Sequence, residues 1–186
     1  MQAIKKIIQN TLHLFYPHIC AGCGSDILSK ENLLCARCLN DLPVTGFAVH
    51  PNNPVEEIFW GRINLKAAHS EFYFDKDALI QHLVHQLKYK SNQSIGVYLG
   101  ELMGKTLLNS KRFENIDALI PLPLYAEKER KRGYNQAAII CNGMSQIMNI
   151  PVITTKLQRQ RYTETQTKKH RTERWENVEG SFKVND

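Results

Sequence analysis

The sequence predicts an α/β domain with a mostly parallel sheet, preceded by a small four-cysteine zinc module. Two Cys-x2-Cys pairs lie close together near the N-terminus, between Cys20 and Cys38. Helical apolar patterns then alternate with short apolar runs ended by prolines, such as IDALIPLPL at 116–124, and such runs are typical of buried parallel strands. A chain of 186 residues can form one domain core and a small appendage.

The cysteine spacing indicates a structural metal site. Cys20 pairs with Cys23 and Cys35 with Cys38, with eleven residues between the pairs. Four thiolates can surround one tetrahedral zinc ion, whereas disulfides are rare in reducing compartments. A redox pair or disulfides remain the alternative. Because four protein ligands leave no open position for a substrate, we expect the zinc to fold a ribbon or knuckle rather than to catalyse.

Composition divides the chain into three parts. Residues 1–45 contain an amphipathic helix predicted at 1–15 and the zinc module. Residues 46–61 mix prolines, glycines and acids, as linkers do. Residues 62–186 form the predicted α/β domain, with helices expected over 77–90 and 94–111 and a basic loop that runs from 125 into a third helix ending near 149.

The sequence contains no apolar run approaching the roughly 18 to 20 residues that cross a bilayer. The first fifteen residues carry two lysines, but polar residues interrupt the apolar run and no small-residue cleavage site follows. We therefore expect a cytoplasmic protein that does not insert into membranes.

Positive charge is concentrated in the last third of the chain. Residues 1–120 hold 12 Lys or Arg against 11 Asp or Glu, whereas residues 121–186 hold 12 against 7. An excess of this kind favours a polyanionic partner, either a phosphorylated small molecule or nucleic acid. An ordinary solvated basic face remains the alternative.

Two basic segments follow predicted strands. The first places Arg130, Lys131, Arg132 and Gly133 between the apolar run 116–124 and a helix, where backbone amides at the helix N-terminus can hold an anion. The second has seven Lys or Arg between positions 156 and 174, interleaved with hydroxyls and a glutamine. Arginine supplies bidentate charge-assisted contacts to phosphate, so both segments are candidate phosphate-binding loops.

The order of these features resembles the ComF family, competence-associated proteins with a phosphoribosyltransferase domain behind a zinc module. The resemblance rests on the double Cys-x2-Cys motif, LVHQLKYKSN, IPLPLYAEKERKRGYNQA and RQRYTETQTKKHRTERWENVEGSF, in that order. It covers nearly the whole chain. The combination is far more specific than any one of its motifs.

The resemblance implies a class I phosphoribosyltransferase fold that binds phosphoribosyl pyrophosphate with Mg²⁺. It also implies a role in the uptake of single-stranded DNA during natural transformation, with a DNA-uptake helicase as a further partner. The pyrophosphate-binding loop would comprise Arg130, Lys131, Arg132, Gly133, Asn135 and Gln136. The flexible loop that closes over the ligand would comprise Arg159, Arg161, Thr163, Thr165, Gln166, Lys168 and Arg171.

The sequence departs from the family pattern at its end. Members of the fold continue into another apolar strand with two adjacent acids and a Thr-Thr-Gly turn, which hold the ribose and the 5′-phosphate. The sequence stops at SFKVND, before such a strand. We therefore expect an incomplete sheet, a C-terminally truncated chain, and little or no transferase activity or phosphoribosyl pyrophosphate binding by this chain alone.

Two function classes follow. In the first, the chain is an accessory protein of DNA uptake that binds phosphoribosyl pyrophosphate, single-stranded DNA or both; Arg130, Arg132, Arg159, Arg161 and Lys168 would contact phosphates, and Tyr134, Tyr162 and Trp175 would stack on bases. The alternative is an active phosphoribosyltransferase, an amidophosphoribosyltransferase-like glycosyltransferase whose acceptor the sequence does not identify. In that case the basic side chains and magnesium would stabilise the departing pyrophosphate.

Overall fold

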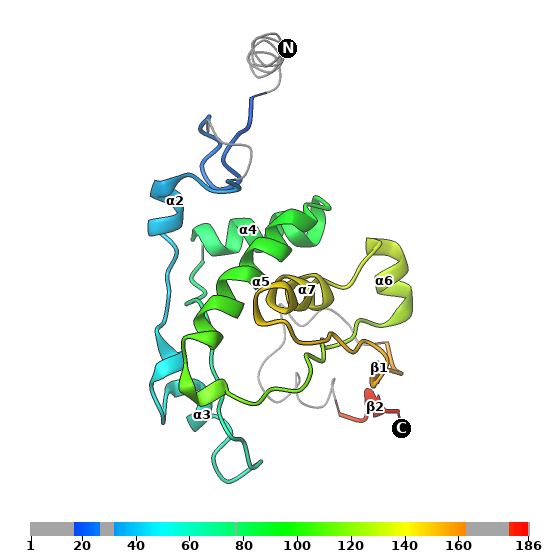
Figure 1. The fold of residues 1–186 in the computed structure, drawn as a ribbon. Coiled ribbons are helices and arrows are strands. Elements are labelled where there is room, and N and C mark those ends of the chain that lie inside the picture. The colour runs from blue at the N-terminus through cyan, green and yellow to red at the C-terminus, as the bar shows by residue number, and fades with distance from the viewer. Residues whose placement is uncertain (1–16, 27–31, 77, 163–178, 186) are drawn as a thin grey trace.

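A computed structural model describes residues 17–26, 32–76, 78–162 and 179–185 (Figure 1). The helix predicted at 1–15 lies outside these ranges, as do Thr163, Thr165, Gln166, Lys168, Arg171 and Trp175. None of the helices within them is long and apolar enough to cross a membrane. The elements are α2 (Ala36–Asn40), η1 (Phe47–Val49), α3 (Pro54–Glu57), α4 (Leu79–Tyr89), α5 (Gln93–Leu108), η2 (Lys111–Phe113), α6 (Ala126–Arg132), α7 (Gln136–Met148), β1 (Leu157–Arg159) and β2 (Phe182–Val184).

Helix α4 forms where the apolar stripe predicted it, and it joins the cysteine segment to the rest of the fold. Its buried side chains Ile80, Leu83 and Leu87 belong to one hydrophobic cluster that also contains Cys20 and Cys38. The cluster continues into α5, so one core runs from the cysteine segment into the main body. The domain boundaries at 45 and 61 stay predictions, and apolar packing crosses both.

Helices α5 and α7 cross at the centre of the fold and approach unusually closely (Figure 1). A Cβ atom on Gly100 of α5 would lie 2.1 Å from the Ile140 carbonyl oxygen, and one on Gly143 of α7 would lie 2.1 Å from the Val97 carbonyl oxygen. Both distances are far inside van der Waals contact. The two glycines therefore set the separation of the helices, because no larger residue fits at either position.

The observed sheet differs from the expected mostly parallel sheet. In the ranges that the structure describes, the named strands form one two-stranded antiparallel sheet, in which β1 pairs with β2 through Leu157–Val184, Gln158–Lys183 and Arg159–Phe182. The class I phosphoribosyltransferase fold thus stays a prediction. In the part of the chain that the structure describes, strand structure consists of this small sheet and three isolated bridges.

One parallel bridge forms within the predicted strand 116–124. Leu119 pairs with Val152, and its N–H donates to the Pro151 carbonyl over 2.9 Å. Helices α6 and α7 connect the two bridged segments. The bridge does not extend into a ladder, because Pro121 and Pro123 carry no N–H group to donate.

The predicted linker 46–61 is tied to the C-terminal end of α5. Ser110 is fully buried and its hydroxyl donates to the Ala48 carbonyl over 2.6 Å. Glu56 accepts hydrogen bonds from the Ala68 N–H and the Arg112 guanidinium, and these two bonds lower the pKa of the Glu56 carboxyl group. Residues 46–61 therefore contact the main body directly.

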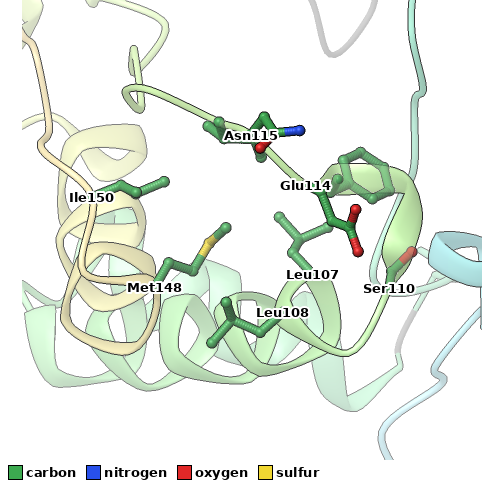
Figure 2. Close-up of a pocket in the computed structure, with 9 residues that line it drawn as sticks. Leu107, Leu108, Ser110, Glu114, Asn115, Met148 and Ile150 are labelled. Carbon is green, nitrogen blue, oxygen red and sulfur yellow. The ribbon is translucent and has the colours of Figure 1, made fainter.

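A pocket of about 210 Å³ opens beside the end of α5 (Figure 2). Leu107, Met148 and Ile150 give it apolar walls, and Glu114 and Asn115 lie at its edge. None of the residues predicted to bind phosphate lines it.

Gly100→Ala should lower the free energy of unfolding by about 3 kcal/mol, because the new methyl group would push against the backbone of α7. Urea denaturation checks this value. Gly96→Ala is the matched control on the same helix, since its new Cβ would meet the movable Ile139 side chain at 2.7 Å. There the gain in helix propensity of about 1 kcal/mol offsets most of the repacking cost. Equal losses in the two variants would contradict the backbone-contact argument.

Candidate metal centre and basic surface

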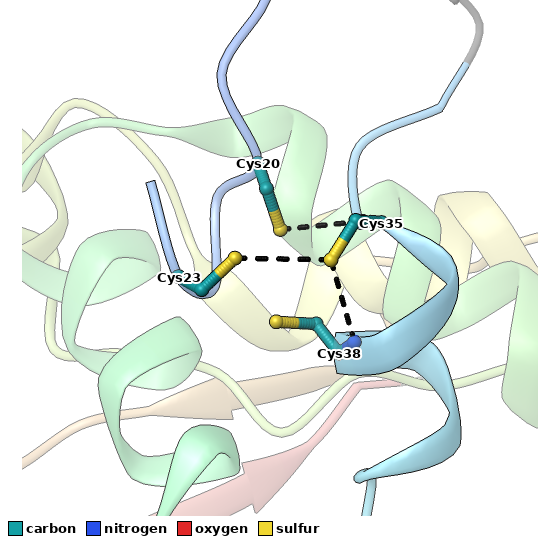
Figure 3. Close-up of side chains that lie close together, drawn as sticks. All are labelled: Cys20, Cys23, Cys35 and Cys38. Carbon is teal, nitrogen blue, oxygen red and sulfur yellow. Dashed lines mark hydrogen bonds between the residues drawn. The ribbon is translucent and has the colours of Figure 1, made fainter. Parts of the chain in front are cut away.

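The four predicted cysteines converge on one point (Figure 3). Their sulfur atoms all lie within 4.8 Å of one another, and the Sγ atoms of Cys23 and Cys35 are 3.7 Å apart. A tetrahedral zinc site with Zn–S bonds of about 2.3 Å places its sulfurs roughly 3.8 Å apart. The donor set and its spacing therefore fit a zinc ion, as the sequence predicted.

Local backbone geometry places the first cysteine pair. The Cys20 N–H donates to the Ser25 carbonyl over 2.8 Å, and this closes a tight turn. Gly24 adopts a left-handed φ of 73° within the turn. Gly22 lies so close to the cluster that a Cβ atom there would be 2.8 Å from the Cys38 sulfur. Glycine at these two positions lets the chain wrap around the sulfur atoms.

The second pair lies at the start of α2. Cys35 caps this helix, and its sulfur accepts a hydrogen bond from the Cys38 N–H over 3.5 Å. The Cys35 N–H in turn donates to the Cys20 sulfur over 3.2 Å. Backbone amides directed at sulfur stabilise thiolates, the protonation state that binds metal.

The surroundings shift the pKa values of Cys20, Cys23 and Cys38 in different directions. Hydrogen bonds, first of all from the Ser25 hydroxyl, lower the pKa of Cys23 to about 6. Burial alone would raise the pKa of Cys20, but hydrogen bonds led by the Cys35 N–H outweigh it and lower that pKa. Burial, followed by the neighbouring sulfurs, raises the pKa of Cys38 to about 12. A divalent cation bound by the four sulfurs would favour the thiolate form at every position, including the buried Cys38.

The arrangement supports a structural rather than a catalytic metal. Four sulfur ligands would fill the coordination sphere of a tetrahedral zinc ion, and Cys20 and Cys38 are buried. Gln86 of α4 also donates a 2.6 Å hydrogen bond to the Ala21 carbonyl, next to Cys20. A metal at this point would hold residues 17–26 and 32–40 onto α4.

The first predicted phosphate loop is a helix in the structure. Residues Ala126–Arg132 form α6, which ends at Gly133 in a left-handed conformation with a φ of 87°. The side chains of Arg130 and Lys131 are exposed, and that of Arg132 is partly buried. The expectation of a basic loop over this segment was therefore wrong, because seven good helix formers precede the glycine.

The other residues of this predicted loop hold the turn between α6 and α7. Asn135 caps α7 by accepting from the Ala137 N–H over 2.9 Å, and it donates to the Leu122 carbonyl over 3.0 Å. Tyr134 is buried, and its hydroxyl donates to the Leu87 carbonyl of α4. That bond makes Tyr134 a core residue, so the expectation that it stacks on bases was wrong.

Gln136 begins α7, and its side-chain nitrogen Nε2 is buried. This nitrogen has no hydrogen-bond partner within the residues that the structure describes. It is an available donor beside the N-terminus of α7.

The structure describes only the beginning of the predicted flexible loop. Arg159 lies in strand β1, where its guanidinium contacts the Phe182 ring at 5.2 Å. Burial lowers the pKa of this guanidinium. Arg161 and Tyr162 follow the strand with exposed side chains. The structure thus brings Tyr162, but not Arg159, to the exposed surface near α6.

The sequence analysis did not identify Lys128 and Tyr89 as residues of this surface. Lys128 of α6 lies over the Tyr162 ring at 4.7 Å, and Arg132 lies over the Tyr89 ring of α4 at 5.8 Å. Tyr89 stands between Lys88 and Lys90 in the sequence. An aromatic residue between two lysines is a signal of nucleic-acid binding that could have identified it.

Comparisons with known proteins find relatives that are named as a competence protein and as DNA utilization proteins. The chain is similar to Competence protein F of Haemophilus influenzae, with 25% identity over 95% of this chain and 74% of that protein. It is similar to DNA utilization protein YhgH of Escherichia coli, with 24% identity over 80% of this chain and 56% of that protein. YhgH of Salmonella typhimurium shows 24% identity over 89% of this chain and 70% of that protein. No family model and no solved structure matches the chain.

The purified chain should contain close to one zinc ion per molecule, because the four clustered sulfurs can supply all four ligands of a tetrahedral zinc ion. Cys35→Ser should abolish stoichiometric zinc, as measured by elemental analysis. Cys141→Ser is the matched control, since Cys141 lies in α7 outside the cluster, and zinc should stay bound.

Loss of zinc should also increase amide hydrogen exchange in α4, because this helix shares its core with the cysteines. A metal-free chain with unchanged protection in residues 17–26 and in α4 would contradict the structural role.

Proposed function

We propose that this chain, whose resemblance to the ComF family its relatives confirm, acts in DNA uptake or utilisation by binding single-stranded DNA. The DNA would lie on the surface formed by α6, the end of α4 and residues 161–162. The four-cysteine module would have a structural role. A DNA-uptake helicase as partner and a cytoplasmic location remain predictions from the sequence.

The main observation that supports DNA binding is a cationic surface with exposed aromatic rings. Lys131 of α6 is exposed, and the exposed Lys88 and Lys90 flank Tyr89, whose ring contacts Arg132 of α6. Cations bind phosphates without regard to sequence, while aromatic rings stack on bases. Both kinds of contact are thus available on one surface. The names of the relatives, a competence protein and DNA utilization proteins, favour DNA as the polyanion.

A second candidate ligand is a phosphoribosyl diphosphate. Two observations favour it. The α6–α7 connection follows the bridged segment at Leu119, and among the described residues the buried Gln136 side-chain nitrogen at the start of α7 has no hydrogen-bond partner. Ligands of α/β proteins gather at such positions, at the carboxyl ends of parallel strands. Magnesium binding and transferase chemistry remain predictions attached to this alternative.

Single-stranded DNA should bind the chain with an affinity that falls steeply as salt rises. Each neutralised phosphate contributes about 0.7 to the slope of log affinity against log salt. Four contacts would therefore give a slope of roughly −3, measurable by fluorescence anisotropy. Phosphoribosyl pyrophosphate in the presence of magnesium serves as the competitor.

Flat salt dependence would contradict a DNA-binding surface. Micromolar binding of phosphoribosyl pyrophosphate by calorimetry, without DNA binding, would favour the second candidate. Substitution of Lys131 by Ala should weaken DNA binding equally for all DNA sequences, because phosphate contacts carry no base information. Lys111→Ala, in η2 near the apolar pocket, is a control that also removes one surface lysine.

A further inference from the structure

Two exposed tyrosine rings lie beside α6 and come from different parts of the chain. Tyr89 ends α4 and is 65% exposed, while Tyr162 follows β1 and is 53% exposed. Such exposure is high for aromatic side chains, which normally bury most of their surface. Neighbouring rings hold each tyrosine in place: His85 lies 4.7 Å from Tyr89, and Tyr125 contacts Tyr162 edge-on at 5.6 Å.

The cations over these rings lie on one face of α6. Lys128 contacts Tyr162 and Arg132 contacts Tyr89. Residues four apart are neighbours on a helix surface, and four residues rise by about 6 Å. Lys131 lies on the same face, three residues after Lys128. The two rings therefore flank one helical turn that carries three cations.

Arg130 points away from this face. It lies two residues from Lys128 and from Arg132, and residues at that spacing do not share a helix face. Glu127 lies four residues before Lys131, and Glu129 lies three residues before Arg132, so one acidic residue borders each side of the face. The basic run of α6 thus divides into a ring-flanked cationic face and an opposite side that carries Arg130.

We propose that this face is a stacking site for two bases of one single strand of DNA, with Tyr89 and Tyr162 as the two platforms. The inference rests on the proposed DNA-binding function and deepens it. One base enters between the Tyr89 ring and the Arg132 guanidinium, whose plane stacks on bases as it does on rings. A second base stacks on Tyr162, while Lys128 and Lys131 contact the intervening phosphates.

The geometry selects single-stranded DNA over a duplex. Bases in a duplex are already stacked and paired, so their faces are not available to protein rings. The site reads no base identity, because every base has a flat face and phosphate contacts are uniform.

Binding of a labelled oligothymidylate of about sixteen nucleotides, within the range of typical single-strand sites, tests the proposal in the full chain. Tyr89→Ala and Tyr162→Ala should each weaken binding by about 5- to 150-fold, which corresponds to about 1–3 kcal/mol per stacked base. The salt slope should stay unchanged, because no phosphate contact is lost. Tyr89→Phe keeps the ring and should bind like the original chain.

Two charge variants and a duplex ligand test which cations contact phosphates and whether the rings act only on single strands. Lys131→Ala should reduce the salt slope by about 0.7, whereas Arg130→Ala should leave it unchanged. A hairpin duplex should bind the two Tyr→Ala variants and the original chain with affinities within about twofold. Circular dichroism confirms that each variant folds, which exposed substitutions should preserve.

The outcomes separate this inference from the function on which it rests. If the original chain does not bind the oligothymidylate at low salt, both the DNA-binding function and the stacking site are wrong. If it binds with a steep salt slope but the two Tyr→Ala variants bind equally well, only the stacking site is overturned. Equal losses in Arg130→Ala and Lys131→Ala would also overturn the assignment of one face.

Discussion

The close contact between the backbones of α5 and α7 is the constraint on which the rest of the fold depends. Gly100 and Gly143 allow each helix to meet the carbonyl groups of the other directly. With the two helices fixed, α4 packs on α5, and Asn135 in the turn before α7 donates to the Leu122 carbonyl, three residues after the Leu119–Val152 bridge. Neither the metal centre nor the basic surface contributes to this contact, yet both are positioned by it.

Helix α4 connects the metal centre and the basic surface. At one point its Gln86 side chain holds the Ala21 carbonyl beside the cysteines. One residue further along, the Leu87 carbonyl accepts from the buried hydroxyl of Tyr134, which lies two residues after the end of the basic helix α6. The helix then ends at Tyr89, under Arg132. Three successive contacts on about one turn thus fix the cysteine knuckle and α6 relative to each other.

The features that could be predicted from the sequence are those set by local spacing. The four cysteines and the apolar stripe of α4 formed as expected, because each depends on residues close together in the chain. The apolar pattern of 116–124 predicted a strand of a parallel sheet, whereas the structure has one parallel bridge there. The pattern alone does not show that Pro121 and Pro123 stop the ladder after one bridge. The seven-residue helix α6 could have been predicted, because a glycine directly follows a run of helix formers. The pairing of Arg132 with Tyr89 could not, since these residues are 43 positions apart and meet only through packing.

Because the cysteine segment and α4 share one core, metal binding affects the folding equilibrium of the main body as well as that of the cysteine segment. Cys20 and Cys38 are buried in the same cluster as Leu83 and Leu87. A ligand that binds only the folded state stabilises it in proportion to the logarithm of its free concentration. With zinc as that ligand, the folded fraction of the chain would follow the zinc available in its surroundings. The amount of folded chain that presents the basic surface would then depend on the zinc supply, although the ion itself contacts no phosphate.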